Sequence, residues 1–395
     1  MGTKLEEEKQ EKKEYLNAFG FQVSRDPFPT TPPKDVDYWA DNEDVFKDIV
    51  QMEIDSLLFD SSTLNIFWGP IGGGKTFAAS YLKNPLSTES ITKQLNIPSR
   101  PTETLVVPAT RPVKSGQMIY NIHSHIVAEL FSKILKDQDL IKEMKRHVKN
   151  LPEGEIKEAF KNISKNAPIE LFGQHNIDSV ISSEGYKYLT NAKSKIGKVS
   201  DIYVLTSIVK ELIEIISTYY VRTIIAIDEL ENLTKVSVTE RLLVNDYLRR
   251  LFDDNPRGIT LILVFTFDSY EEVTTVLDRS VVSRTRRVIN FGYPDERDIE
   301  TYIKDCIENR SLKKINELMD QGVLKKIVKI VIESLGNDRD FRKINVQMHS
   351  IFRKVFEASG KPPGPIRITG KLIDQSFTQN ADEIASNLKK GQRKN

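Results

Sequence analysis

The chain has 395 residues, and 39% of them are hydrophobic, which is enough for about two or three packed units with buried cores. Its 57 Lys and Arg balance its 56 Asp and Glu, which excludes strong attraction of the whole molecule to nucleic acid or anionic membranes. The single cysteine, Cys306, excludes an internal disulfide framework, and the longest apolar run, 259–267, is too short to cross a bilayer. We therefore expect a cytoplasmic protein with no membrane segment.

The first part of the chain is charged and then rich in proline. Residues 3–18 alternate Glu and Lys with few apolar positions, which predicts a solvated helix or a frayed leader. The prolines between Pro27 and Pro33 indicate an extended boundary segment, because proline disfavours helix at its own position and at the one before it. We expect residues 1–24 to be a charged extension and the first folded domain to begin at residue 25.

A helical pattern begins at Asn42, and residues 63–68 are typical of a short buried strand. A glycine-rich segment and a predicted helix follow this strand. The segment fits the pattern G-x-x-x-x-G-K-[ST] with Gly69, Pro70, Ile71, Gly72, Gly73, Gly74, Lys75 and Thr76, and Phe77 comes next.

Glycines in this arrangement let backbone N–H groups point at phosphate oxygens, and the following helix adds its positive N-terminal end. Lys75 would reach the outer phosphates, and Thr76 would offer a hydroxyl to Mg²⁺, which prefers hard oxygen ligands. The motif predicts that residues 69–77 bind ATP or ADP. A flexible glycine turn is the alternative.

The next elements alternate between strand and helix. Apolar patterns predict a strand at 104–108, a helix at 116–135, a helix at 202–220, a strand at 222–227, a helix at 242–252 and a strand at 259–267. Residues 136–200 are rich in Lys and Glu with weak helical periodicity, which indicates a helical insertion. The alternation predicts an α/β fold in which helices cover both faces of a parallel sheet.

The strand signal nearly vanishes after Pro294. Helical patterns at 297–309, 323–335, 339–358 and 370–377 predict a separate all-helical domain over residues 293–378, and residues 379–395 form a basic tail. The nucleotide-binding domain would then span residues 25–292, with the helical insertion at about 136–200.

Two acids follow the strand at 222–227. Asp228 and Glu229 stand where an open parallel sheet places its ligands, and this is the Walker B arrangement. Asp228 would hold Mg²⁺, and Glu229 would orient and deprotonate the water that attacks the terminal phosphate. The alternative is a pair of acids stabilised by a helix N-terminus.

These two motifs, together with the polar end of the strand at 259–267 and the segment Gly336-Asn337-Asp338-Arg339, resemble the AAA+ ATPases. The branches most similar are the initiators and transposition regulators, which include origin-recognition proteins, ExeA-type ATPases and transposon target-selection ATPases. The resemblance covers roughly residues 25–378. It implies a P-loop NTPase core, a C-terminal helical lid, and ATP hydrolysis with Mg²⁺ in a homo-oligomer.

The resemblance also assigns roles to residues outside the two motifs. Thr266 is similar to sensor one, a polar side chain between the two Walker strands that contacts the attacking water or the terminal phosphate; a plain strand-end hydroxyl is the alternative. Arg284 is similar to the arginine finger that acts on a neighbouring subunit's nucleotide. Arg279, Arg286 and Arg287 are competitors for this role, and a solvated basic surface is the alternative.

Arg339 resembles the sensor-two arginine of the lid, with Arg342 as the fallback. Tyr38 and Trp39 lie where relatives place a segment beside the adenine, although plain packing explains them as well.

Two departures from the AAA+ pattern bear on function. The insertion lengthens the interval between the motifs and is the natural docking place for a protein partner. The segment after Phe377 is too short for the winged-helix domain of origin-binding relatives, so we do not expect sequence-specific duplex recognition by that route.

The leading hypothesis is an ATP-dependent switch on DNA, in replication, transposition or defence. The alternative is a protein-directed remodeller or signalling ATPase that recruits its partner through residues 136–200.

Overall fold

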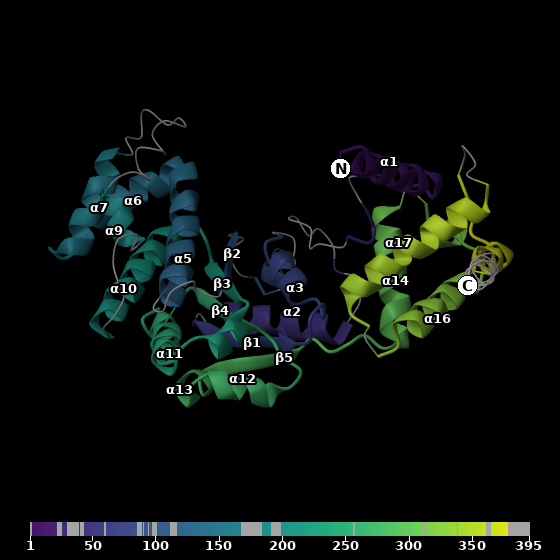
Figure 1. The fold of residues 1–395 in the computed structure, drawn as a ribbon. Coiled ribbons are helices and arrows are strands. Elements are labelled where there is room, and N and C mark those ends of the chain that lie inside the picture. The colour runs from purple at the N-terminus through teal and green to yellow at the C-terminus, as the bar shows by residue number, and fades with distance from the viewer. Residues whose placement is uncertain are drawn as a thin grey trace. The chain divides into compact units, whose positions relative to one another are not determined.

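The computed structural model describes residues 2–21, 26–29, 39, 43–58, 61–84, 89, 91–93, 95–96, 101–110, 117–166, 184–190, 199–255, 257–311, 313–337, 339–360 and 365–377 (Figure 1). The chain divides into two compact units. The sheet unit comprises residues 44–71 and 75–291, and the helical unit comprises residues 1–43, 72–74 and 292–395. Each unit has its own hydrophobic core.

Five parallel strands form the sheet of the sheet unit. They are β1 (Thr63–Gly69), β2 (Thr102–Pro108), β3 (Arg222–Asp228), β4 (Ile259–Thr266) and β5 (Thr285–Asn290), in the spatial order β2-β3-β4-β1-β5. β3 and β4 are buried along nearly their whole length because they lie inside the sheet and each contains a continuous apolar run, 224–227 in β3 and 261–265 in β4. Since all strands are parallel, their carboxyl ends lie along one edge, with Thr266 opposite Gly69 and Asp228 opposite Pro108.

Helices pack against this sheet. α3 (Lys75–Tyr81) and α12 (Tyr270–Val276) contact β1, and α5 (Gln117–Lys136) contacts β2, α10 (Val199–Ile216) and α11 (Val238–Asp253). The remaining described helices of the core are α2 (Glu43–Leu58), the 3-10 helix η3 (Leu230–Lys235) and α13 (Arg279–Val282). The predicted α/β fold is therefore confirmed.

The insertion contains three described helices, α6 (Gln138–Asn150), α7 (Glu155–Asn166) and α9 (Glu184–Leu189). They are amphipathic, and their apolar residues, such as Leu140, Met144 and Phe160, are fully buried in the same core as α5 and α10. The described helices of the insertion thus share the core of the sheet unit. Removal of the insertion would expose the apolar faces of α5 and α10.

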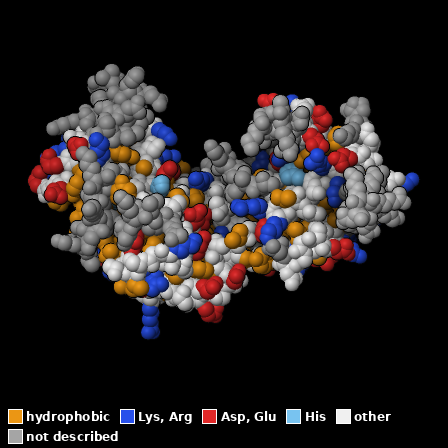
Figure 2. Space-filling view, in the orientation of Figure 1, with side chains coloured by type: hydrophobic (Ala, Val, Ile, Leu, Met, Phe, Trp, Pro, Cys, Tyr) orange, Lys and Arg blue, Asp and Glu red, His pale blue; other side chains and the backbone are white. Residues whose placement is uncertain are grey.

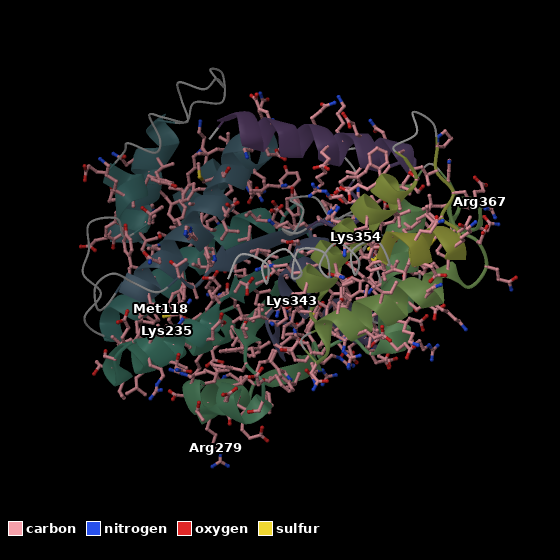
Figure 3. All side chains as sticks on the ribbon, turned by 45° about the vertical axis from the view of Figure 1, so that its right-hand side comes forward. Met118, Lys235, Arg279, Lys343, Lys354 and Arg367 are labelled. Atoms are coloured by element: carbon pink, nitrogen blue, oxygen red, sulfur yellow. The ribbon has the colours of Figure 1, made fainter. Side chains whose placement is uncertain are left out.

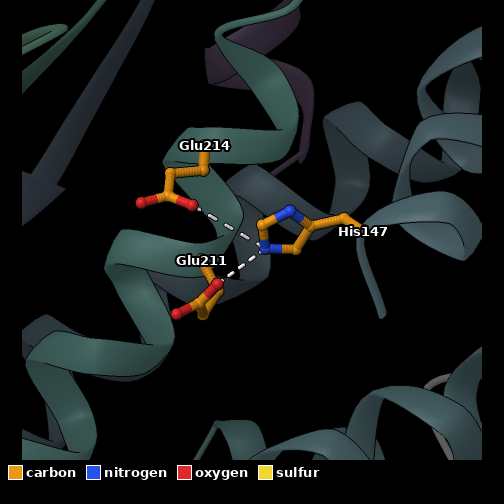
Figure 4. Close-up of side chains that lie close together, drawn as sticks. All are labelled: His147, Glu211 and Glu214. Atoms are coloured by element: carbon orange, nitrogen blue, oxygen red, sulfur yellow. Dashed lines mark hydrogen bonds and ion pairs between the residues drawn. The ribbon is translucent and has the colours of Figure 1, made fainter. Parts of the chain in front are cut away.

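A cluster of ionisable side chains joins α6 to α10 at the surface of the insertion (Figure 4). His147 Nε2 lies 2.6 Å from Glu211 Oε2 and 3.9 Å from Glu214 Oε2. The hydrogen bond that His147 donates to the Glu211 carboxylate raises the pKa of His147, which favours an imidazolium beside the two carboxylates. His147 of α6 is paired with both glutamates of α10, so we interpret the cluster as a cross-link between the two helices.

The helical unit packs α14 (Glu296–Arg310), α15 (Ile315–Leu318), α16 (Val323–Leu335) and α17 (Phe341–Ala358), and residues 370–377 are also helical. The predicted all-helical C-terminal part is therefore present, while the basic tail at 379–395 lies outside the described residues. None of the described helices is both long enough and apolar enough to span a lipid bilayer.

The N-terminal helix α1 (Gly2–Ala18) belongs to this helical unit and contacts α17. The expectation of a merely solvated helix is wrong for its C-terminal end, where Leu16 and Phe19 are fully buried. The ring of Phe19 lies 4.8 Å from that of Phe352, centroid to centroid. The reason is that the charged residues occupy the first turns of α1, whereas its apolar residues gather in the last turn and just beyond it.

The described part of the proline-rich segment, residues 26–29, also contacts α17. Phe28 is fully buried and stacks on Phe352 at 5.8 Å between centroids, and its carbonyl lies 2.9 Å from His349 Nε2. We predicted that this segment belongs to the nucleotide-binding domain, which would begin at residue 25. The side chain of Phe28 is instead buried in the core of the helical unit. Tyr38 lies outside the described residues, and Trp39 is half-buried.

Candidate functional site

The glycine-rich loop joins β1 to α3. Gly69 has a φ of +147°, and a Cβ atom there would lie 2.2 Å from the carbonyl oxygen of Phe291, which only glycine avoids. Gly72 and Gly74 also have positive φ, +76° and +98°, which glycine adopts without strain. The sequence of the loop therefore matches the backbone that it has to form, a turn whose N–H groups can face an anion.

Lys75 begins α3 and is buried, with only 5% of its surface exposed. Its Nζ donates hydrogen bonds to the carbonyl oxygens of Gly69, at 2.8 Å, and Pro70, at 2.7 Å. Burial lowers the pKa of Lys75 to about 8, and the charges of Asp228 and Glu231 oppose that decrease. An ammonium group has three donors, so one remains for a further acceptor such as a phosphate oxygen.

Thr76 and Asp228 come together across the carboxyl edge of the sheet. Thr76 Oγ1 donates a hydrogen bond to Asp228 Oδ2 at 2.7 Å, although the two residues are 152 positions apart in the chain. Asp228 ends β3, whose neighbour β4 lies between it and β1, so the parallel topology itself brings the loop and the acid together. A hydroxyl and a carboxylate oxygen side by side are hard oxygen donors, and these residues fit Mg²⁺.

Glu229 lies in an unusual backbone conformation. Its φ of 63° and ψ of 28° are left-handed, and it is one of two non-glycine residues with positive φ in the described chain. Such a conformation costs on the order of 1–2 kcal/mol for a residue with a side chain. The turn is held by the Glu229 N–H, which donates to Asp228 Oδ1 at 2.8 Å, and the residue is exposed. Strain of this kind is often found in functional sites.

Thr266 ends β4 between the loop strand and the acidic strand. Its backbone N–H donates to Glu231 Oε2 at 3.2 Å, and the next N–H, that of Phe267, donates to the carbonyl of Gly69 at 3.2 Å. Sequence reasoning missed Glu231. The available signal was its place two residues beyond the acidic pair, in Asp228-Glu229-Leu230-Glu231.

The arginines proposed as fingers differ in their contacts. Arg284 makes a two-pronged interaction with Asp253, with Nε to Oδ1 at 2.7 Å and Nη2 to Oδ2 at 3.0 Å. Arg287 and Arg286 both face Asp55, with Nε to Oδ2 distances of 2.9 and 3.5 Å.

Arg279 is exposed at the start of α13 and points away from the ribbon (Figure 3). Its side chain has no hydrogen-bond or ion-pair partner among the described residues. Three of the four arginines are thus paired with acids of their own unit, whereas Arg279 has no such pair among the residues that the structure describes.

Arg339 and Arg342 belong to the helical unit. Arg339 is half-buried immediately before Asp340, which caps α17 by accepting from the backbone N–H of Lys343 at 2.8 Å. Arg342 is exposed on the first turn of α17. The sensor-two role of either residue stays a prediction.

A parallel sheet with a glycine-rich loop after β1 and an acidic pair at the end of β3 defines the P-loop class of nucleotide-binding α/β proteins. Within that class, the position of Thr266 on a strand between the loop strand and the acidic strand is the one that the AAA+ resemblance requires. The predicted α/β P-loop fold with a helical C-terminal part is confirmed.

Comparison with known proteins finds similar solved structures, all at low sequence identity. No protein-family model matches the sequence, and no curated protein sequence matches it. The ORC1 protein of Aeropyrum pernix, solved in complex with DNA, is similar in structure, with 12% identity, a TM-score of 0.48, and coverage of 90% of this chain and 69% of that one.

Two further solved structures are similar over comparable lengths. The RuvB Holliday junction branch migration motor of Thermotoga maritima has 11% identity, a TM-score of 0.39, and coverage of 89% and 73%. A Walker-type ATPase of Pyrococcus abyssi has 12% identity, a TM-score of 0.43, and coverage of 93% and 80%. At these levels of likeness, the fold class rests on the strand order and the loop of the chain itself.

Proposed function

We propose that this protein binds and hydrolyses ATP with Mg²⁺ and works as an oligomeric, nucleotide-dependent switch that acts on DNA. The observation that carries the ATPase proposal is the 2.7 Å hydrogen bond between Thr76 and Asp228, which joins the phosphate loop to the acidic strand. A loop that served only as a turn would not need a buried lysine, Lys75, next to a hydroxyl and a carboxylate that are hydrogen-bonded to each other.

The proposed chemistry assigns one task to each group. Lys75 holds the outer phosphates, and Thr76 and Asp228 hold Mg²⁺, which when bound neutralises charge on the phosphate oxygens. Glu229 takes a proton from water as the water oxygen bonds to the γ-phosphorus. The bond from this phosphorus to the β–γ bridging oxygen breaks, and ADP leaves with that oxygen. Thr266 is proposed to orient the water, and Arg339 to contact the phosphates.

Replacing Lys75 with Ala tests the binding step. We expect the dissociation constant for ATP to rise by about 10- to 100-fold, because a hydrogen bond to a charged group contributes about 1.5–3 kcal/mol. Fluorescent-nucleotide titration measures the change, and Lys83→Ala, which alters an exposed lysine beyond the end of α3, is the matched control. Normal ATP affinity in a folded Lys75→Ala protein, as judged by circular dichroism, would show that the loop is misassigned.

The DNA part of the proposal rests on the resemblance to the initiator and transposition-regulator branches. The charge distribution of a single copy gives little support for DNA binding, because three of the four arginines at 279–287 are paired with acids. Acidic and basic side chains are also interspersed over the described surface in view (Figure 2). We therefore propose that DNA is engaged by an assembly, in which weak contacts of several copies act together.

Filter binding with duplex DNA at low salt tests this part. We expect a complex with ATP and Mg²⁺ and at least about tenfold weaker binding without nucleotide, because only the assembly presents several contacts at once. The matched control is Lys75→Ala, which should bind DNA equally weakly under both conditions. Absence of binding would remove DNA from the proposal, and binding that is indifferent to nucleotide would remove the nucleotide-dependent switch on DNA. Either outcome leaves the ATPase proposal intact.

A protein-directed ATPase is the second candidate, and one observation favours it. α6 exposes Lys142, Arg146 and Lys149, which are spaced so that they lie along one face of the helix. Because deletion of the insertion would open the shared core, we would change only this face, with Arg146→Glu and Lys149→Glu together. Recruitment of a protein partner that is lost in this variant, with turnover and DNA binding retained, would favour the second candidate.

A further inference from the structure

The carboxylate of Glu231 accepts a hydrogen bond from a backbone N–H at the end of β4, beyond the last residue pair of β3 with β4. The pairing of β3 with β4 ends at Ile227 and Leu263, because β3 turns away after Asp228. The N–H of Thr266, three residues further along β4, accordingly bonds to the Glu231 side chain, at 3.2 Å. Glu231 therefore connects the turn that carries Glu229 to the end of the strand that carries Thr266.

A neutral acceptor would make this connection at a lower electrostatic cost. Burial raises the pKa of Glu231, and the nearby charges of Asp228 and Glu229 raise it further. In the part of the chain that the structure describes, Glu231 accepts from backbone N–H groups and from no cationic side chain. The charge of Lys75 attracts that of Glu231, but the pKa of Glu231 stays raised, so a third carboxylate in this place still works against folding. Costs of this kind are expected where function requires the residue.

We propose that Glu231 is a positioning residue for ATP hydrolysis, which fixes Thr266 relative to the turn that carries Glu229. This inference rests on the proposed function and goes beyond it, because it assigns a task to a residue outside the two motifs. Glu231 touches neither phosphate nor water in this role. It acts by holding the end of β4 against the acidic turn, so that the hydroxyl of Thr266 and the carboxylate of Glu229 meet the same water.

Two substitutions separate positioning from simple stabilisation. Glu231→Ala removes the acceptor, and we expect kcat to fall by about 10- to 100-fold, as for a misplacement of reacting groups by about 1 Å, with the dissociation constant for ATP changed by less than about threefold. Glu231→Gln keeps an oxygen that can accept from the Thr266 N–H, and we expect it to restore most of kcat. Glu271→Gln, which changes an exposed glutamate of α12, is the matched control.

Stability and hydrogen exchange supply readouts that do not depend on turnover. Because the folded-state pKa of Glu231 is raised, its ionisation opposes folding as pH rises, so Glu231→Gln should raise the melting temperature at pH 8 more than at pH 5. Exchange of the Thr266 amide should accelerate in Glu231→Ala and stay slow in Glu231→Gln.

Equal kcat in wild type and Glu231→Ala overturns the inference alone. So does a Glu231→Ala protein that loses stability and ATP affinity together with kcat, because that pattern is structural. If wild-type protein shows no ATP turnover with Mg²⁺, the proposed function itself fails. In that case the exchange experiment still reports whether Glu231 holds the end of β4.

Discussion

Glu229→Gln is expected to lower kcat for ATP by about 100- to 10,000-fold and to leave ATP binding unchanged, since general base catalysis contributes about that much. The amide of glutamine cannot take the proton of the attacking water. ATP binding should persist because Lys75, Thr76 and Asp228 keep their positions. Single-turnover hydrolysis and equilibrium binding of labelled ATP, measured on the same preparation, separate the two effects.

The backbone at Glu229 offers a control for this experiment. Its left-handed conformation suits glycine, so Glu229→Gly should relieve strain while removing the carboxylate. A Glu229→Gly protein that is at least as stable as wild type and as inactive as Glu229→Gln would assign the loss to chemistry and not to a distorted turn. Unchanged turnover in Glu229→Gln would instead mean that another group accepts the proton.

Much of the sheet unit could be predicted because its signals are local. The strands β3 and β4 each contain an unbroken apolar run, and the glycine pattern requires a strand before it and a helix after it. The meeting of Thr76 and Asp228 then follows from topology, since parallel strands end along one edge. Short elements such as η3 and α13 were not predicted, because one or two turns carry too little periodicity.

Contacts between distant side chains could not be predicted. Nothing in the sequence around Arg284 says that Asp253 will hold its guanidinium, and nothing around Glu231 says that β4 lacks a backbone acceptor at Thr266. The burial of Phe19 in the helical unit depends on α17, which follows more than 300 positions later in the chain. Such contacts are decided by packing between elements, which a pattern along the chain does not encode.

The paired state of Arg284 changes how the arginine-finger proposal is tested. A surface ion pair contributes about 0–1 kcal/mol, so the interaction with Asp253 can be exchanged for a phosphate of a neighbouring subunit at little cost. If Arg284 is the finger, assembly releases it from Asp253. Arg279 needs no release, because its side chain already projects without a described partner (Figure 3). Single replacements of each arginine by Ala therefore belong in one experiment.

We expect Arg284→Ala to lower kcat by about 1,000-fold or more at saturating ATP, the range observed for arginine fingers, and to leave the dissociation constant for ATP unchanged. Arg279→Ala is the matched comparison. A larger loss of kcat in Arg279→Ala than in Arg284→Ala would transfer the role to Arg279. The measurement is steady-state phosphate release over a range of protein concentrations, because a finger supplied by a neighbour acts only in the assembled state.

Mixing variants decides whether the finger acts between subunits. Arg284→Ala subunits keep an intact phosphate loop, and Lys75→Ala subunits keep an intact Arg284, so a mixed assembly contains junctions in which both halves are functional. We expect partial recovery of phosphate release when the two inactive proteins are combined. If each arginine served the nucleotide of its own subunit, no junction in the mixture would be complete, and the mixture would stay as inactive as its components.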